Sequence, residues 1–292
     1  MLVTLKNDKI CVQINSRGAE LFSLKKVGDD TEYLWQGDKK YWGDRAINLF
    51  PICGRLVEGR YTYAGESYDM TIHGFVKQSE MEVVSQTADK AVFRLTANEE
   101  TRKAYPFEFV YDVIYSLEGN TLKQTFAVRN TDDKELIFGL GGHPGYNVPL
   151  EAGETFEDYY VQFDCAKEPK ALVMSPTCFF TGDFVPFPLE ENGCLSLRHS
   201  LFDDDAIFLA DVCKGIELKS RKSARKVRMM YPDMKFLGFW HMPRTDAPYI
   251  CIEPWSSTPS FEGKVDAMET KNEMVHLAPG GVYENAFTIS IE

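Results

Sequence analysis

A period-2 pattern of apolar side chains between residues 107 and 117 is the feature that most constrains the fold of this chain. Apolar side chains stand at every second position there: Phe107, Phe109, Tyr111, Val113, Tyr115 and Leu117. An amphipathic helix needs apolar residues three and four positions apart, so this run predicts a half-buried β-strand. The turn-forming residues 118–120 follow it.

The same alternation recurs along the chain. A strand at 122–128, a polar turn at 130–134 and a strand at 136–140 extend the first strand into an antiparallel meander. Shorter alternating runs predict three more strands, at residues 10–14, 81–84 and 91–95. Helix signals are few, and the best is a two-turn helix over 98–104 that begins with a capping Asn98.

We therefore expect an all-β fold of antiparallel strands with few short helices. With 44% hydrophobic and 13% aromatic residues, the 292-residue chain can fill a large core. No repeat, low-complexity tract or linker divides it, so a single domain over residues 1–292 is expected.

Charge and hydropathy exclude several classes of partner. The chain has 44 acidic and 32 basic residues, a net charge of −12, which would repel nucleic acid and anionic membranes. No apolar run approaches the length of a membrane span, and the first residues do not resemble a signal peptide. We expect a cytoplasmic protein whose partner is a small molecule.

The seven cysteines show no spacing typical of a disulfide framework or a zinc ribbon. Their number is odd, and no two are arranged as Cys-x-x-Cys. Most are expected to be small buried apolar residues. This usage favours a reducing compartment.

Familiar catalytic motifs are missing from the sequence. It contains no P-loop, no His-Glu-x-x-His and no Gly-x-Ser-x-Gly. Residues 139–143 resemble the start of a dinucleotide-binding fingerprint, but Pro144 follows in place of a helix.

Three segments place a titratable residue in an unusual setting. Arg55 follows a glycine in the apolar segment 48–56, and His73 precedes Gly74 shortly downstream. His143 lies among glycines and Pro144, where the strand over 136–140 is expected to end. Glu253 ends an apolar strand, and Pro254 is expected to weaken the strand pairing there.

Each of these residues also has a purely structural interpretation. The histidine can be a satisfied turn residue, the glutamate can reach solvent, and the arginine can bridge two strands. Together they favour chemistry, because a carboxylate flanked by apolar residues is costly unless it is paired or used. A histidine and a carboxylate in one cleft form an acid–base pair that can work near neutral pH.

These segments, in this order, resemble the aldose 1-epimerase (galactose mutarotase-like) family, and most of all its LacX-type branch. The resemblance rests on residues 48–56, His73-Gly74-Phe75, Gly142-His143-Pro144 and Ile252-Glu253-Pro254-Trp255, and extends from about residue 10 to 287. It implies a large antiparallel β-sandwich, a supersandwich, with an open cleft. It also implies an isomerase that interconverts the α and β anomers of an aldose and needs no cofactor or metal.

The resemblance assigns roles to individual residues. Glu253 would be the general base at the C1 hydroxyl, and His143 the general acid at the ring oxygen. His73 and Arg55 would hold the sugar, together with Asp205 at the end of an acidic run. That run is equally compatible with a solvated turn. Trp255, Trp240 and Phe75 would offer apolar faces to the sugar, although core packing explains Trp240 at least as well.

The sequence leaves the substrate and the activity open. Relatives often have an arginine after His-Gly-Phe, where this chain has Val76-Lys77. Lys77 and Arg60 would be the cations for a hexose 6-phosphate, but the acidic balance favours a neutral hexose. A sugar-binding protein without turnover is the main alternative. A hydrolase or lyase is less favoured, because a hydrolase needs a second carboxylate. His199, His241 and His276 match no role, and the oligomeric state is open.

Overall fold

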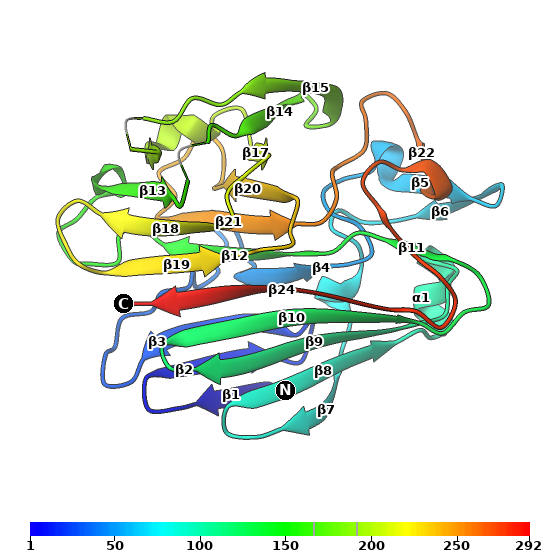
Figure 1. The fold of residues 1–292 in the computed structure, drawn as a ribbon, viewed down its shortest axis with the longest axis horizontal. Coiled ribbons are helices and arrows are strands. Elements are labelled where there is room, and N and C mark those ends of the chain that lie inside the picture. Colours follow the sequence, from blue (N-terminus) through cyan, green and yellow to red (C-terminus); the bar gives the residue numbers. More distant parts are fainter. Residues whose placement is uncertain (166, 191) are drawn as a thin grey trace.

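The computed structural model describes residues 1–165, 167–190 and 192–292, and it confirms an all-β fold of antiparallel sheets (Figure 1). Two large sheets and three small ones account for the strands of these residues. Side chains from both large sheets meet in one hydrophobic cluster, which includes Phe126 and Phe287 of one sheet and Ile250 and Ile252 of the other.

The larger sheet has nine strands and includes the predicted meander. The C-terminal strand, red in Figure 1, lies in its middle between β19 and β10. In spatial order the strands are β16 (Cys194–Ser196), β13 (Tyr159–Phe163), β18 (Gly215–Ser220), β19 (Lys226–Met230), β24 (Val282–Ile291), β10 (Thr121–Asn130), β9 (Phe109–Glu118), β8 (Lys90–Thr96) and β7 (Glu82–Gln86).

The second large sheet has seven strands. It contains the segments around His143 and Glu253 that were singled out in the sequence. In spatial order they are β15 (Phe180–Pro186), β14 (Lys170–Met174), β17 (Ile207–Ala210), β20 (Phe236–Trp240), β21 (Tyr249–Trp255), β12 (Gly141–Asn147) and β4 (Ala46–Leu49). The third segment begins on β4 and continues into the loop that carries Arg55.

Smaller elements surround these sheets. Three small sheets comprise β1 (Leu2–Lys6), β2 (Ile10–Asn15) and β3 (Glu20–Lys26); β11 (Leu136–Phe138) and β23 (Val275–Leu277); and β22 (Asp266–Ala267), β5 (Arg60–Tyr63) and β6 (Glu66–Asp69). The helices are α1 (Glu99–Ala104) and the 3₁₀ turns η1 (Val57–Gly59), η2 (Val76–Gln78), η3 (Phe156–Asp158), η4 (His199–Phe202) and η5 (Met268–Thr270).

Local signals in the sequence explain several of these elements. Helix α1 begins where predicted, because the Asn98 side chain accepts from the backbone N–H groups of Glu100 and Thr101. In β9 buried and half-buried positions alternate from Phe109 to Leu117. The expectation that His143 follows a strand end is wrong in detail. Strand β11 ends at Phe138, and His143 lies within the next strand, β12.

One disulfide corrects the expectation that the cysteines are unpaired. Cys165 and Cys213 are bonded across 48 residues of sequence. Cys165 follows β13 and Cys213 precedes β18, and these strands pair antiparallel with Phe163 opposite Ile216, so their ends meet. Spacing along the chain cannot show such a pairing.

Among the residues that the structure describes, no helix has the length and apolar character needed to cross a membrane.

Gly74 fixes the approach of the His73 segment to β4. A Cβ built on Gly74 would lie 2.0 Å from the Phe50 carbonyl oxygen, and its φ is +78°. The backbone contact is close because Phe75 N–H donates to that carbonyl, at 3.1 Å. Only glycine combines this conformation with this approach.

Gly74→Ala is therefore expected to destabilise the fold by roughly 3 kcal/mol or more, because a backbone oxygen cannot move aside cheaply. Urea unfolding of both proteins measures the change. Gly153→Ala is the matched control, since Gly153 also has a positive φ (+87°) but nothing within 4 Å of a built Cβ. An equal loss in both variants would show that the close approach does not matter.

Candidate active site

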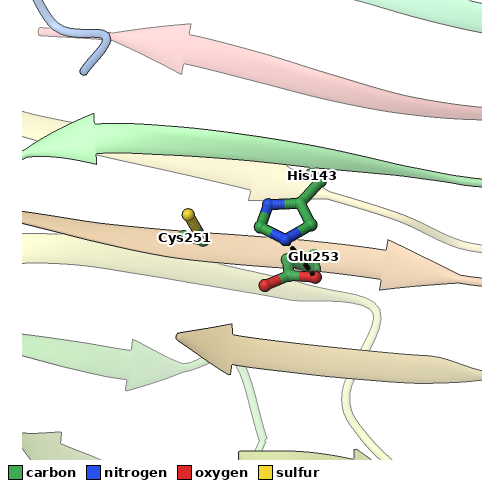
Figure 2. A group of neighbouring side chains, drawn as sticks. All are labelled: His143, Cys251 and Glu253. Carbon is green, nitrogen blue, oxygen red and sulfur yellow. Dashed lines mark ion pairs between the residues drawn. The ribbon is translucent and has the colours of Figure 1, made fainter. Parts of the chain in front are cut away.

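His143 and Glu253 face each other on neighbouring strands of the seven-stranded sheet. In the antiparallel register of β12 and β21, Gly141 pairs with Trp255 and Gly145 with Cys251, which places His143 directly across from Glu253. His143 Nε2 lies 3.2 Å from Glu253 Oε2 (Figure 2). The contact follows from strand pairing, since directly opposed side chains are nearest neighbours.

The expected weakening of the ladder at Pro254 occurs on one side of β21. Towards β12, the register shows no pair between Gly141–Trp255 and Gly145–Cys251. Towards β20 the register continues through Gly238 opposite Glu253 and Leu237 opposite Pro254. Strand β21 thus remains anchored on one side, while its ladder to β12 is interrupted beside the two titratable side chains.

Alternation along β21 separates the core from the site. Ile250 and Ile252 point into the main hydrophobic cluster. Tyr249, Cys251 and Glu253 lie on the opposite face with Trp255, all less than 2% exposed. One strand therefore supplies both core side chains and a buried carboxylate.

All five residues that the resemblance assigned line one cavity of about 320 Å³. They are Arg55, His73, His143, Asp205 and Glu253. The other lining residues are Trp42, Asp44, Ile47, Gly54, Ile72, Lys77, Met174, Cys178, Asp204, Ala206, Phe208, Trp240, Pro243, Trp255 and Pro259. Segments more than two hundred residues apart in sequence, from Trp42 to Pro259, thus line the same cavity.

Burial works against charge on both members of the facing pair. His143 and Glu253 are 6% and 1% exposed. Desolvation lowers the pKa of His143 to about 3. Desolvation, and then the negative charge of Asp205, raise the pKa of Glu253 well above its usual 4.5. Over a broad pH range the pair therefore holds one proton between two atoms at hydrogen-bond distance.

His73 is fixed beside this pair by two backbone hydrogen bonds to Gly54. Its own N–H donates to the Gly54 carbonyl at 2.8 Å, and Gly54 N–H donates to His73 Nδ1 at 3.2 Å. Because Nδ1 accepts, the neutral ring carries its proton on Nε2. Burial, and then the charge of a protonated His143, keep the pKa of His73 well below its usual value, so the ring stays neutral.

Asp205 connects two walls of the cavity. Its Oδ1 accepts from Trp240 Nε1 at 2.9 Å, and its Oδ2 lies 3.4 Å from an Arg55 guanidinium nitrogen. The backbone of Asp205 has a positive φ of +83°. The arrangement orients Arg55 and Trp240 but leaves the Arg55 side chain 40% exposed.

Aromatic rings form the sides of the site. The Trp42 ring lies over His143 with centroids 4.8 Å apart, and it also contacts Trp240 edge-on. Sequence reasoning did not single out Trp42. Phe75, suggested as a sugar face, lies elsewhere and packs in the core against Phe50 and Tyr105.

The cations considered for a phosphate lie in different places. Lys77 lines the cavity. Arg60 is not among the lining residues and pairs with Glu58 on the surface. The three remaining histidines also lie outside the lining: His199 Nδ1 is 3.2 Å from His241 Nε2, and His276 pairs with Glu135.

Comparison with known proteins relates this site to one family. The family model described as aldose 1-epimerase matches residues 1–290. Protein LacX of Lactococcus lactis subsp. lactis, in its plasmid and chromosomal forms, is 32% identical over 303 residues, covering 100% of this chain and 99% of the relative.

Solved structures of the same kind of protein are also similar to this chain over its full length. A galactose mutarotase related enzyme from Lactobacillus acidophilus has 34% identity and a TM-score of 0.95, covering 100% of this chain and 97% of its own. A galactose mutarotase-like protein from Lactobacillus casei has 30% identity and a TM-score of 0.94, with both chains fully covered. The supersandwich predicted by resemblance is thereby confirmed.

The buried carboxyl group predicts an unusual pH dependence of stability. The pKa of Glu253 is raised in the folded protein. The contribution of this carboxyl group to the free energy of unfolding is therefore fully present below pH 4.5 and is lost as pH rises through the folded pKa. Glutamine does not ionise, so Glu253→Gln does not lose stability in this way. The variant is therefore expected to gain stability over the parent protein as pH rises above 4.5, measured by urea unfolding at several pH values.

Glu262→Gln is the control, because Glu262 is exposed and lies outside the cavity. Its stability difference from the parent protein should stay flat with pH. If Glu253→Gln gave the same flat profile, the carboxyl group of Glu253 would be as well solvated as that of a surface residue.

Proposed function

This chain belongs to the aldose 1-epimerase family, and on that premise we propose that it interconverts the α and β anomers of a hexose by acid–base ring opening and closure. The observation that carries the proposal is the His143–Glu253 pair, 3.2 Å apart at a cavity whose volume suits a monosaccharide. Pure binding does not need an acid and a base in contact.

The proposed reaction moves protons and leaves the oxidation state unchanged. Glu253 takes the proton of the C1 hydroxyl, while His143 gives a proton to the ring oxygen and the bond between C1 and that oxygen breaks. The open-chain aldehyde rotates about C1–C2. The ring then closes on the other face, with the two residues exchanging their roles.

The surroundings of the pair suit this exchange. Ring opening converts a carboxylate and an imidazolium into a carboxylic acid and a neutral imidazole. Burial favours these neutral forms, as the raised pKa of Glu253 and the lowered pKa of His143 indicate. Sugar hydroxyls are very weak acids, so positioned proton transfer contributes about 10²–10⁴-fold to the rate.

The other cavity residues position the sugar in this proposal. Neutral His73 offers its Nε2–H as a donor, and Arg55, held by Asp205, offers guanidinium N–H groups. Trp255 and Trp240 present apolar ring faces to the C–H side of the sugar. Trp42, lying over His143, restricts the imidazole to one orientation.

Two substitutions test the acid–base assignment. Glu253→Gln and His143→Ala are each expected to slow catalysed mutarotation by about 10²–10⁴-fold, because each removes one proton-transfer group. Polarimetry of freshly dissolved α-D-glucose and α-D-galactose measures the rate, and the equilibrium rotation must stay unchanged. Unfolding curves report whether each variant keeps the fold.

The same measurement separates an enzyme from a binding protein. Saturable sugar binding by calorimetry without any acceleration by the parent protein would favour a carbohydrate-binding or sensor protein. Near-normal turnover in either variant would refute the roles given to Glu253 and His143. A hydrolase would instead release a new reducing end from an oligosaccharide.

A hexose 6-phosphate is the second candidate substrate, and the observation that favours it is Lys77 in the cavity wall. Lys77 has no ion-pair partner among the described residues, whereas Arg55 is paired with Asp205. Four carboxyl groups line the same cavity, those of Asp44, Asp204, Asp205 and Glu253. This balance favours a neutral hexose.

Lys77→Met distinguishes the two substrates. If the substrate is a neutral hexose, we expect the parent protein to have a higher kcat/KM for the hexose than for its 6-phosphate. Lys77→Met should then change kcat/KM for the hexose little. NMR exchange measures the anomerisation rates of both sugars. A lysine–phosphate bond worth about 1.5–3 kcal/mol would instead make Lys77→Met lower kcat/KM for the 6-phosphate by roughly 10- to 100-fold. Arg60→Met is the control, since Arg60 lies outside the cavity lining.

A further inference from the structure

Cys251 lies beside the acid–base pair, and the proposed reaction gives it no role. It precedes Glu253 by two residues on β21 and so shares its face, while its register partner on β12 is Gly145. Figure 2 shows the three side chains grouped between the two strands.

Their donor atoms are close enough to share one ion. One ligand atom from each of His143, Cys251 and Glu253 lies within 4.8 Å of the other two, and all three residues are buried. Tetrahedral zinc, with ligands at about 2.0–2.3 Å, holds its donors roughly 3.3–3.7 Å apart. The 3.2 Å between His143 Nε2 and Glu253 Oε2 is close to that spacing, and Cys251 offers the third ligand atom within the 4.8 Å limit of the group.

We propose that His143, Cys251 and Glu253 form a site for a thiophilic divalent cation, Zn²⁺ in the first place, and that the bound ion switches off the acid–base pair. Imidazole, thiolate and carboxylate are the ligand types that zinc selects. Mg²⁺ and Ca²⁺ prefer sets of oxygen ligands and find one carboxylate here.

The charges of this complex balance. Binding displaces the thiol proton of Cys251 and the single proton shared by His143 and Glu253. A thiolate, a carboxylate and a neutral imidazole then surround Zn²⁺ with a total charge of zero. A neutral complex suits this buried position, where an isolated charge is costly. Two protons leave, so binding tightens as pH rises.

The ion would enter through the sugar cavity, which His143 and Glu253 line. Three protein ligands leave a fourth position for water. The nitrogen and oxygen atoms that would move protons during ring opening are then occupied by the metal. Sugar and metal should therefore compete.

Direct metal binding is the first test, and it does not depend on the proposed function. The parent protein is titrated with Co²⁺, whose thiolate charge-transfer absorption reports a cysteine ligand, and with Zn²⁺ by calorimetry. One equivalent should bind, and the absorption should be missing in Cys251→Ser. Cys178→Ser is the matched control, because Cys178 also lines the cavity but lies outside the three-residue group.

Inhibition is the second test, and it rests on the proposed function. Zn²⁺ should inhibit mutarotation reversibly, with recovery on adding a chelator. Each variant is compared with its own rate without metal. Cys251→Ser should weaken inhibition by roughly ten-fold or more, since loss of an outer-shell partner already costs 10–100-fold in affinity. Cys11→Ser, on β2, should leave inhibition unchanged.

Several results would overturn the proposal. Thiolate absorption that persists in Cys251→Ser but disappears in Cys178→Ser would place the metal elsewhere. Equal inhibition of the parent protein and Cys251→Ser would mean that the thiol is not a ligand. Cys251→Ala serves for the same comparisons if Cys251→Ser does not fold. A parent protein that binds Co²⁺ through Cys251 but lacks turnover would refute the epimerase and leave the metal site standing.

Discussion

The architecture of the site depends on one constraint, the opposition of His143 and Glu253 in the register of β12 and β21. If either strand slipped by one residue, its member of the pair would turn to the other face of the sheet, where Ile250 and Ile252 join the apolar cluster. Gly142 allows β12 to lie close to the nine-stranded sheet, because a Cβ there would be 2.7 Å from the Phe287 ring. Packing of the two large sheets thus helps to set the register.

A buried polar network holds the loop that adjoins the site. Lys271 Nζ donates to the Thr258 carbonyl at 2.9 Å and lies 3.4 Å from Asp266 Oδ2, which also accepts from Ser260 Oγ at 2.6 Å. Ser260 N–H donates in turn to the Arg55 carbonyl. Desolvation lowers the pKa of Lys271, so its ion pair is retained against a cost. The network connects β22 to the cavity wall.

Sequence reasoning reached the fold and the cavity residues for different reasons. Period-2 alternation located strands such as β9, and the capping Asn98 located helix α1, because both signals are local. Arg55, His73, His143 and Glu253 stood out by their sequence setting, and the family resemblance gave them roles and added Asp205. The structure brings all five to one cavity. Trp42 and the Cys165–Cys213 disulfide depend on which distant segments meet, and no local pattern encodes that. Phe75 failed as a sugar face because an aromatic ring suits a core and a sugar equally well.

The burial that makes the pair suited to proton exchange also makes it suited to a soft metal. Desolvation keeps one proton on His143 and Glu253 together, and it removes the water that would otherwise compete for their lone pairs. A thiol two residues before the glutamate completes a set of zinc-type ligands on the same face. Replacing Cys251 by an apolar residue of similar size would separate these properties, since strand register positions the acid and base while the thiol alone adds affinity for the metal. The proposed acid–base pairing and the proposed metal binding therefore depend on different features, the first on the register of β12 and β21 and the second on the Cys251 thiol.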